Sequence, residues 1–215
     1  MTHDTFTLDF PLSRQHTGLP IANGSLGVLL WGGGRELQLT AALEACWDHR
    51  FSEKLRKPIP YDDLVAAWTP ESVDEVNRLL RENSGPEQPR LTGTRYWCST
   101  RVGGGTFTLQ LAAELEQIEL EYATGTVTIR TAAGNLTLEL DLATDQLSIA
   151  DPAGIIRSVE PHPMWEKLHD FFEEGRFQAP ERFEGGWFQP CPADPGCWMQ
   201  LRKVPGGWRL SAALQ

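Results

Sequence analysis

The chain has 215 residues, of which 40% are hydrophobic and 22% are charged, as is ordinary for a globular protein. A chain of this length can bury a hydrophobic core without disulfides or metals to hold it. Its net charge of −10 repels nucleic-acid phosphates and anionic membrane surfaces. We therefore expect neither nucleic acid nor a membrane as a partner, and the sequence has no apolar run of the roughly 18 residues that span a bilayer.

The N-terminal residues lack the basic and apolar segments of a secretory signal peptide. The sequence as given predicts a cytoplasmic location, although a parent protein could be exported. The four cysteines, at positions 46, 98, 191 and 197, match no zinc-binding spacing. We expect free thiols, no metal and no other cofactor. The alternative is a disulfide between Cys191 and Cys197, which flank a proline-rich loop and could pair in an oxidising compartment.

The first elements in chain order are predicted to be strands. Residues 4–10 are typical of a short strand. Residues 25–31 form an apolar run with flanking glycines, which indicates a buried strand. The glycines at 32–34 come next, and residues 36–40 then alternate between polar and apolar. This order predicts a β-hairpin with a glycine turn.

The period changes between residues 61 and 83. Apolar residues recur there at helical spacing, first around Leu64 and Trp68 and then from Val73 to Leu80. Between these two groups, Thr69 and Pro70 supply an N-cap residue followed by a proline in the first turn. The pattern predicts a helical insertion over about 61–83.

From residue 106 to residue 160 the period is two, in short segments separated by turn residues such as Gly125, Gly134 and Gly154. Alternation of this kind buries one face of each strand and leaves the other in water. Many short strands with turns between them are typical of an antiparallel sandwich. We therefore predict a mainly-β fold, an antiparallel β-sandwich comprising most of residues 4–43 and 106–160, with the short helical insertion.

The C-terminal part is less regular. Residues 162–174 predict a short amphipathic helix that begins at Pro163, and the glycines and prolines of 175–196 indicate loops. A final hairpin is expected from 198–204 and 208–214. Because no polar tail follows its last strand, we expect the chain to be cut from a longer protein.

The segment from Gly18 to Gly34 carries a family resemblance. Its Leu19-Pro20, Asn23-Gly24 and Leu-Gly strand, followed by the glycine turn, resemble the opening of family-95 glycoside hydrolases, six-hairpin enzymes that include α-L-fucosidases. The similarity is clearest over residues 17–50 and is only topological over 106–160. Glu44 is the only acid just before Trp47, where the family commonly has Asn-Glu-Asp, and this favours a divergent branch over the fucosidases proper.

This resemblance implies that residues 1–215 form a single supersandwich-like N-terminal domain. In the family, the catalytic acid and base belong to a downstream α-toroid, for which this chain has no segment left. The resemblance therefore implies no catalytic residue here, and an inactive chain when it is alone. The implied function is a non-catalytic domain of a carbohydrate-metabolising glycosidase, which packs on and shapes the downstream catalytic domain.

The candidate site residues are weak ones, chosen for a glycan subsite or for the seam with that catalytic domain. Aromatic faces suit both roles, because they pack against sugar C–H groups and against apolar partners. An exposed seam would also let the isolated domain self-associate. The candidates are Trp47, Asp48, His49, Arg50, Trp187 and Trp198. For residues 47–50 the alternative is a local ion pair between Asp48 and Arg50, with Trp47 in the core.

Two other classes of function stay open. One is a free-standing carbohydrate-binding module, distinguished by sugar binding to the isolated chain. The other is a small sandwich enzyme of the aldose-mutarotase type, which needs a histidine and a glutamate on a concave sheet face. The pattern places none of the five histidines inside an alternating strand, which disfavours the enzyme.

Overall fold

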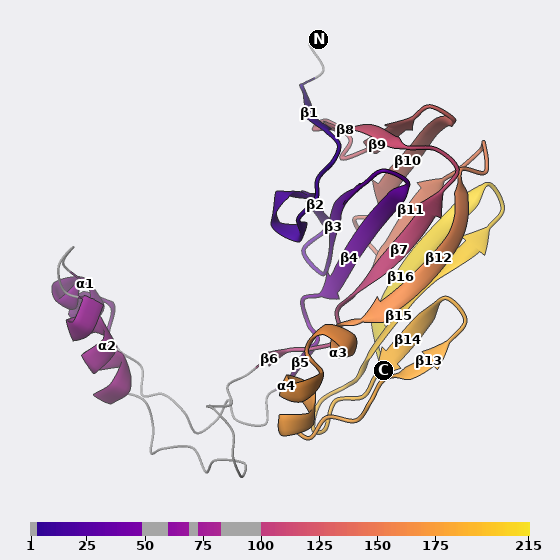
Figure 1. Ribbon diagram of the computed structural model, residues 1–215. Coiled ribbons are helices and arrows are strands. Elements are labelled where there is room, and N and C mark those ends of the chain that lie inside the picture. Colours follow the sequence, from indigo (N-terminus) through magenta and orange to yellow (C-terminus); the bar gives the residue numbers. More distant parts are fainter. Residues whose placement is uncertain (1–3, 49–59, 69–72, 83–99) are drawn as a thin grey trace.

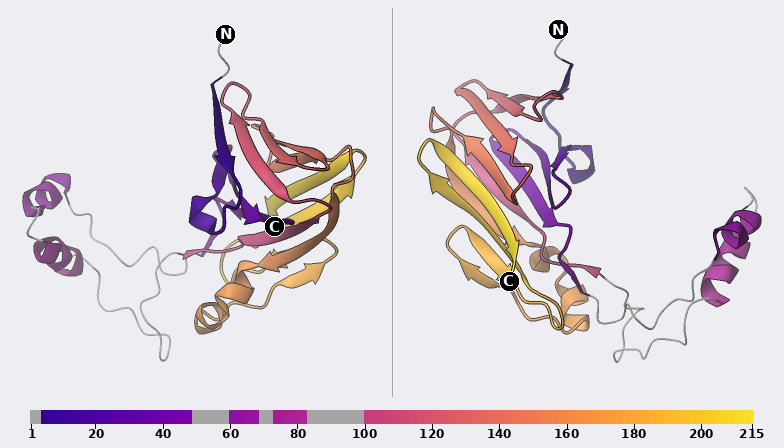
Figure 2. Two further views of the ribbon diagram at one scale, coloured as in Figure 1. Left: turned by 45° about the horizontal axis from the view of Figure 1, so that its top comes forward. Right: turned by 180° about the vertical axis from the view of Figure 1, so that it is seen from behind.

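The computed structural model describes residues 4–48, 60–68, 73–82 and 100–215. A nine-stranded and a five-stranded antiparallel sheet pack face to face (Figure 1). The view from behind in Figure 2 brings the nine-stranded sheet to the front, with the yellow C-terminal hairpin in it. This arrangement confirms the predicted mainly-β antiparallel sandwich.

The five-stranded sheet faces the viewer in Figure 1, and all of its strand pairs are antiparallel. In spatial order its strands are β12 (Ile156–Pro163), β7 (Gly105–Leu111), β4 (Glu36–Leu43), β3 (Leu26–Gly33) and β2 (Leu19–Ala22). The hairpin of β3 and β4 is the one predicted around the glycine turn.

The nine-stranded sheet joins the N-terminal strand, the meander of the middle of the chain and the C-terminal strands. Its strands are, in spatial order, β1 (Thr5–Asp9), β8 (Leu115–Glu121), β9 (Val127–Thr131), β10 (Gly134–Leu140), β11 (Gln146–Ala150), β16 (Gly207–Leu214), β15 (Cys197–Val204), β14 (Gly186–Gln189) and β13 (Glu181–Phe183). The predicted final hairpin is present as β15 and β16. The loop prediction for 175–196 is wrong in part, because β13 and β14 lie inside it.

The remaining elements are short. A two-residue ladder joins β5 (Trp47–Asp48) to β6 (Thr100–Arg101), and η1 (Gln15–Thr17) is a single 3-10 turn. The predicted helices of the insertion are α1 (Tyr61–Ala67) and α2 (Val73–Glu82), and the later helix is split into α3 (Met164–Lys167) and α4 (His169–Glu174). No helix in the described part of the chain has the length and apolarity needed to cross a membrane.

The core lies between the two sheets and follows from the period-two pattern. Alternate residues of β3 and β4 are buried, and so are alternate residues of β9, β10 and β11 that face them. Each fully buried leucine or isoleucine contributes about 1.5–3 kcal/mol relative to an exposed one. The largest core side chains are Trp187 and Phe107, whose rings stack with 4.9 Å between centroids. A Cβ on Gly105 would lie 2.5 Å from the Trp187 ring, so a glycine is required beside it.

One side chain ties the two sheets together at their turns. Asn23, in the turn between β2 and β3, accepts hydrogen bonds at Oδ1 from the backbone N–H groups of Ser25 (3.0 Å) and Leu26 (2.7 Å). Its Nδ2 donates to the carbonyl oxygens of Asp141 (2.9 Å) and Thr144 (2.8 Å), in the turn between β10 and β11. Asn23, the first residue of the Asn-Gly pair in the resembling segment, therefore has a structural role in this fold.

Candidate functional site

The outward face of the five-stranded sheet carries a set of aligned polar side chains. The alternation that buries the leucines of β3 and β4 turns the intervening residues outward. The strand registers then place these residues in rows that run across the strands, for example from Trp31 through Gln38 and Thr108 to Glu160. We call this set the polar face. It consists of Trp31, Glu36, Gln38, Thr40, Thr106, Thr108, Gln110, Glu160 and His162.

Hydrogen bonds fix the centre of the polar face. The Trp31 Nε1–H donates to Thr40 Oγ1 at 3.0 Å, and the hydroxyl oxygens of Thr40 and Thr106 are also 3.0 Å apart. Lys167 Nζ reaches Thr106 Oγ1 at 3.4 Å. Because its N–H is held in this chain, the half-buried indole of Trp31 has a defined orientation.

A second pair of bonds orients the amide and carboxylate groups. The Thr108 hydroxyl donates to Gln38 Oε1 at 2.7 Å, and Gln110 Nε2 donates to Glu36 Oε1 at 2.9 Å. These bonds use the single amide oxygen of Gln38 and one of the two carboxylate oxygens of Glu36. Among the described residues, the Gln38 NH₂ group and the second Glu36 oxygen bond to no other protein group, so both can bond a ligand.

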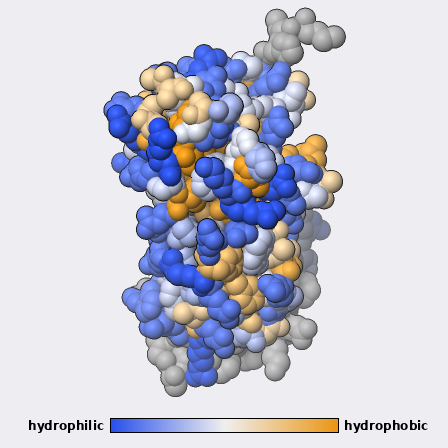
Figure 3. All heavy atoms as spheres, turned by 90° about the vertical axis from the view of Figure 1, so that its right-hand side faces the viewer, coloured by the Kyte–Doolittle hydropathy of each residue, from blue (hydrophilic) through white to orange (hydrophobic). Residues whose placement is uncertain are grey.

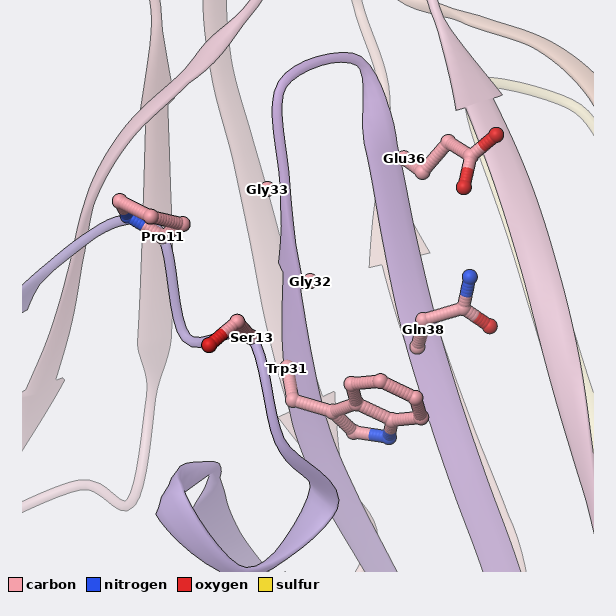
Figure 4. A pocket seen from close by; sticks show the side chains of 7 residues that line it. All are labelled: Pro11, Ser13, Trp31, Gly32, Gly33, Glu36 and Gln38. Atoms are coloured by element: carbon pink, nitrogen blue, oxygen red, sulfur yellow. The ribbon is translucent and has the colours of Figure 1, made fainter.

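An open pocket of about 190 Å³ lies at the Trp31 end of the polar face (Figure 4). Figure 4 shows the indole reaching from β3 toward β4, close to Gln38, with the loop that carries Ser13 on the other side of β3. The volume is below the about 300–1,000 Å³ of pockets for drug-sized ligands, so it suits one small ring. Its lining is Pro11, Ser13, Trp31, Gly32, Gly33, Glu36 and Gln38.

Two glycines make this pocket geometrically feasible. Gly32 has φ +140°, and a Cβ there would lie 2.2 Å from the Glu36 carbonyl oxygen. A Cβ on Gly33 would lie 2.7 Å from the Pro11 ring carbon Cβ. The glycine turn therefore lets the Pro11 loop approach β3 and form the pocket wall.

The opposite end of the polar face is an ionic cluster around His162. Its Nδ1 lies 3.0 Å from Glu166 Oε2, and its Nε2 lies 3.8 Å from Glu160 Oε2. Arg182 forms an ion pair with Glu166 and donates to the Pro161 carbonyl oxygen at 3.3 Å. The imidazole is thus held between two carboxylates, one of which is neutralised by a guanidinium.

The position of His162 corrects the sequence interpretation. The residue lies inside strand β12 and faces outward beside Thr106, whereas the pattern placed no histidine in a strand. Pro163 predicted a helix start, and α3 does begin at Met164, but His162 still belongs to β12. Pro161 and Pro163 fit a strand here because β12 is an edge of its sheet, where a residue without an N–H is tolerated.

The six candidate residues predicted from the sequence do not belong to the polar face. Trp47 is half-buried and Asp48 is buried, both in β5, while His49 and Arg50 lie outside the described residues. Trp187 has no exposed surface and belongs to the core, so it cannot line a surface site. Trp198 is half-buried on the outer face of the nine-stranded sheet, stacked on Phe183 with 6.0 Å between ring centroids.

The expected apolar seam stays a prediction. Figure 3 shows hydrophobic residues in patches among hydrophilic ones on the side of the sandwich that it views. The large hydrophobic side chains that are exposed come from distant parts of the chain, among them Phe6, Tyr122, Leu142 and Phe183.

Sequence reasoning missed the polar face because it treated every outward residue as solvated surface. A signal was present in the residue types. The outward positions of β4 and β7 are threonine, glutamine, one glutamate and one alanine, whereas β8 carries Glu116, Glu119 and Glu121, of which Glu119 is paired with Arg130. Uncharged side chains that bond to one another suit a surface that binds a neutral ligand better than charged side chains do.

No known family model and no curated protein matches this chain. The resemblance to family-95 glycoside hydrolases therefore stays a prediction. What the structure establishes is a mainly-β domain of two antiparallel sheets. Within the described ranges, no group of three or more histidine, cysteine or acidic side chains is arranged to hold a metal ion.

Proposed function

We propose that this chain is a non-catalytic domain of a carbohydrate-active protein and that it binds a neutral glycan on the polar face. The observation that carries the proposal is the pocket beside Trp31, where an indole of fixed orientation adjoins an amide and a carboxylate. A sugar ring has an apolar C–H face and hydroxyls around its rim. An aromatic plane and neighbouring planar polar groups meet both features.

The chemistry of the polar face favours a neutral ligand. Its centre is built from hydroxyl and amide groups with one ammonium, Lys167, which donates to Thr106, and its carboxylates can accept hydrogen bonds from sugar hydroxyls. The arginine at the His162 end, Arg182, is already paired with Glu166. The net charge of −10 also opposes the approach of an anionic polymer.

The rows of the polar face set the direction of the ligand. From β3 to β12 there are three strand intervals of about 4.8 Å, or roughly 14 Å across the sheet. A glycan of several units that lies across the strands would begin at the Trp31 pocket and end near His162. Binding to more than one row would then raise affinity above that of a single sugar.

The wider context of the proposal rests on the family resemblance. Residues 17–50 include β2, β3 and β4, which contribute the Trp31 side of the polar face. On this reading the domain packs on a downstream catalytic domain and holds the glycan for it. The alternative is a free-standing carbohydrate-binding module, which would use the same face without that partner.

A second candidate function is favoured by the position of His162. A histidine bonded to Glu166 and adjoining Glu160, on the same sheet face as Trp31, has the groups needed for acid–base catalysis on a bound sugar. Opening an aldose ring needs one group to take the proton of the anomeric hydroxyl and another to protonate the ring oxygen. This is the reaction of the aldose-mutarotase type of sandwich enzyme.

The proposed glycan site is tested by titrating the chain with a panel of neutral oligosaccharides in a calorimeter. Replacing Trp31 by alanine should weaken binding roughly 10- to 100-fold, as for a central aromatic contact. The matched control is Trp198→Ala, which removes a half-buried tryptophan from the other sheet and should leave binding unchanged. Equal affinity of the Trp31→Ala and wild-type chains, with both folded by circular dichroism, would show the proposal to be wrong.

A further inference from the structure

The N-terminal strand β1 is an edge of the nine-stranded sheet, and β8 is the one described strand that pairs with it. Just beyond one end of β1, the Phe10 N–H donates to the Glu116 carbonyl oxygen at 3.0 Å. Beyond the other end, the Tyr122 N–H donates to the Asp4 carbonyl oxygen at 3.2 Å. Because the backbone groups of alternate residues point to the same side of a strand, the even-numbered residues of β1 bond to β8.

The odd-numbered residues of β1 therefore turn their N–H and C=O groups away from the sheet. They are Thr5, Thr7 and Asp9, and all three are exposed. β1 lies at a margin of the sandwich (Figure 2). The opposite edge of the same sheet is β13, which has three residues, two of them charged, and short charged edges discourage the addition of a strand. β1 has five residues and no proline, so its free edge can pair with one more strand.

The inner side of β1 carries apolar surface that the single chain leaves partly exposed. Leu8 lies opposite the buried Ile118, and Phe6 lies opposite Leu120, so both face the core side of the sheet. Phe6 is nevertheless 40% exposed, and Leu8 is only half-buried. A strand added beside β1 would remove part of this surface from water.

The sequence of β1 is complementary to itself. When two copies of the strand run antiparallel about Thr7, Phe6 of each copy faces Leu8 of the other on the inner side of the sheet. Apolar pairs directly opposite each other stabilise a sheet. On the outer side, Thr5 faces Asp9, and Thr7 faces its own equivalent. No two like charges of β1 stand opposite each other in this register.

We propose that two copies of this chain associate through β1, in an antiparallel pair with a two-fold axis at Thr7. In this register the outward residues form hydrogen-bonded pairs, Thr5 with Asp9 and Thr7 with its equivalent, and each pair exchanges two N–H···O bonds. The contact between two five-residue strands is small, so the dimer should be populated only at high concentration. The net charge of −10 on each copy opposes association, and added salt should therefore strengthen it.

The symmetry of this pair has a consequence for the polar face. The two-fold axis is perpendicular to the nine-stranded sheet, so the two sheets join edge to edge and both five-stranded sheets lie on the same side of them. The two polar faces then point to the same side of the dimer. A glycan long enough to reach both would bind the dimer more tightly than a single chain. This consequence rests on the proposed function, whereas the association through β1 does not.

The experiment follows the mass of the full chain by analytical ultracentrifugation from about 10 μM to about 1 mM. Cys46, Cys191 and Cys197 are free thiols, so a reducing agent is added to prevent disulfides between chains. Thr7→Lys and Thr7→Glu change an exposed residue, so both variants should fold. Each places like charges opposite one another at the two-fold axis and should raise the dissociation constant roughly 10-fold. An equal mixture of the two variants should associate more tightly than either alone, because opposite charges then face each other.

The matched controls are Ser148→Lys and Ser148→Glu, which make the same charge changes at an exposed hydroxyl residue of β11, inside the same sheet. They should leave the dissociation constant within about twofold of the wild type. A wild type that stays monomeric at about 1 mM in added salt would overturn the inference. So would a dimer that the Thr7 and Ser148 variants weaken equally, which would place the contact on another surface, such as the apolar seam predicted from the sequence. The third contrary result is a mixture of the Thr7 variants that associates no better than either variant alone.

Discussion

The Asn23 clamp between the two sheets provides a quantitative test of the fold. In Asn23→Asp the retained Oδ1 can still accept from Ser25 and Leu26, but the NH₂ group that donates to Asp141 and Thr144 is lost. Each lost bond costs about 1 kcal/mol, so the free energy of unfolding should fall by about 2 kcal/mol. For a chain of this size that corresponds to a Tm roughly 4–8 °C lower.

The pH dependence of this variant follows from the same contacts. A carboxyl at position 23 faces two carbonyl oxygens, which favour its protonated form, while the N–H groups of Ser25 and Leu26 favour its charged form. Because protonation also restores a donor to the two carbonyl oxygens, we predict that they outweigh the N–H groups and that the pKa is higher in the folded state than in the unfolded one. The folded variant then binds more protons, and its deficit relative to the wild type grows as pH rises through the folded pKa. The deficit should shrink below about pH 4, near the unfolded pKa of an aspartate, because a protonated carboxyl can donate one of the lost bonds.

The assay is urea unfolding followed by circular dichroism at pH 7 and at the lowest pH where the wild type is folded. Asn135→Asp is the matched control, because it adds the same charge at an exposed position of β10. A surface change of this kind should cost less than about 0.5 kcal/mol. If Asn23→Asp costs no more than Asn135→Asp, the clamp does not stabilise the contact between the sheets.

Two further predictions concern the core and the second candidate function. Trp187→Ala should lower the free energy of unfolding by about 3–5 kcal/mol, because it leaves a cavity beside Phe107 in the core. Trp187→Phe should cost clearly less, because it also removes a buried indole N–H that has no hydrogen-bond partner among the described atoms; equal losses would contradict this account. If the chain is a mutarotase, polarimetry should show faster relaxation of freshly dissolved aldoses, and His162→Gln should abolish the effect. A rate equal to that of buffer alone would eliminate this candidate.

Much of the fold could be predicted because a strand with one buried face alternates between apolar and polar residues. The strands between 106 and 160 and those of the final hairpin are long enough to show this alternation. β13 and β14 have three and four residues, too few to establish a period, and glycines and prolines surround them. β12 extends to Pro163, past the residues whose alternation predicts a strand, because Pro163 is typical of a helix start and therefore predicts that the strand ends before it.

The candidate site was harder to predict, because it depends on which strands are neighbours. Alternation tells which side chains face outward, but it does not tell that β4 lies beside β7 and β7 beside β12. Thr40 and Thr106 are bonded to each other although 66 residues separate them. Trp187 was singled out for its aromatic character, and nothing in the residues around it distinguishes a core tryptophan from one at the surface.

The two prolines of β12 also bear on whether the protein stays soluble. The Met164 N–H donates to the Gly104 carbonyl oxygen, on the β7 side, whereas the Pro161 carbonyl oxygen accepts from Arg182, on the other side. Because the backbone groups of alternate residues in a strand point to the same side, Pro161 and Pro163 stand at positions whose N–H would point away from the sheet. An edge strand with a free row of N–H groups is a template on which another chain can add a strand and begin aggregation. Here the row is interrupted at two successive outward positions. The edge beside the polar face is thereby protected against strand addition.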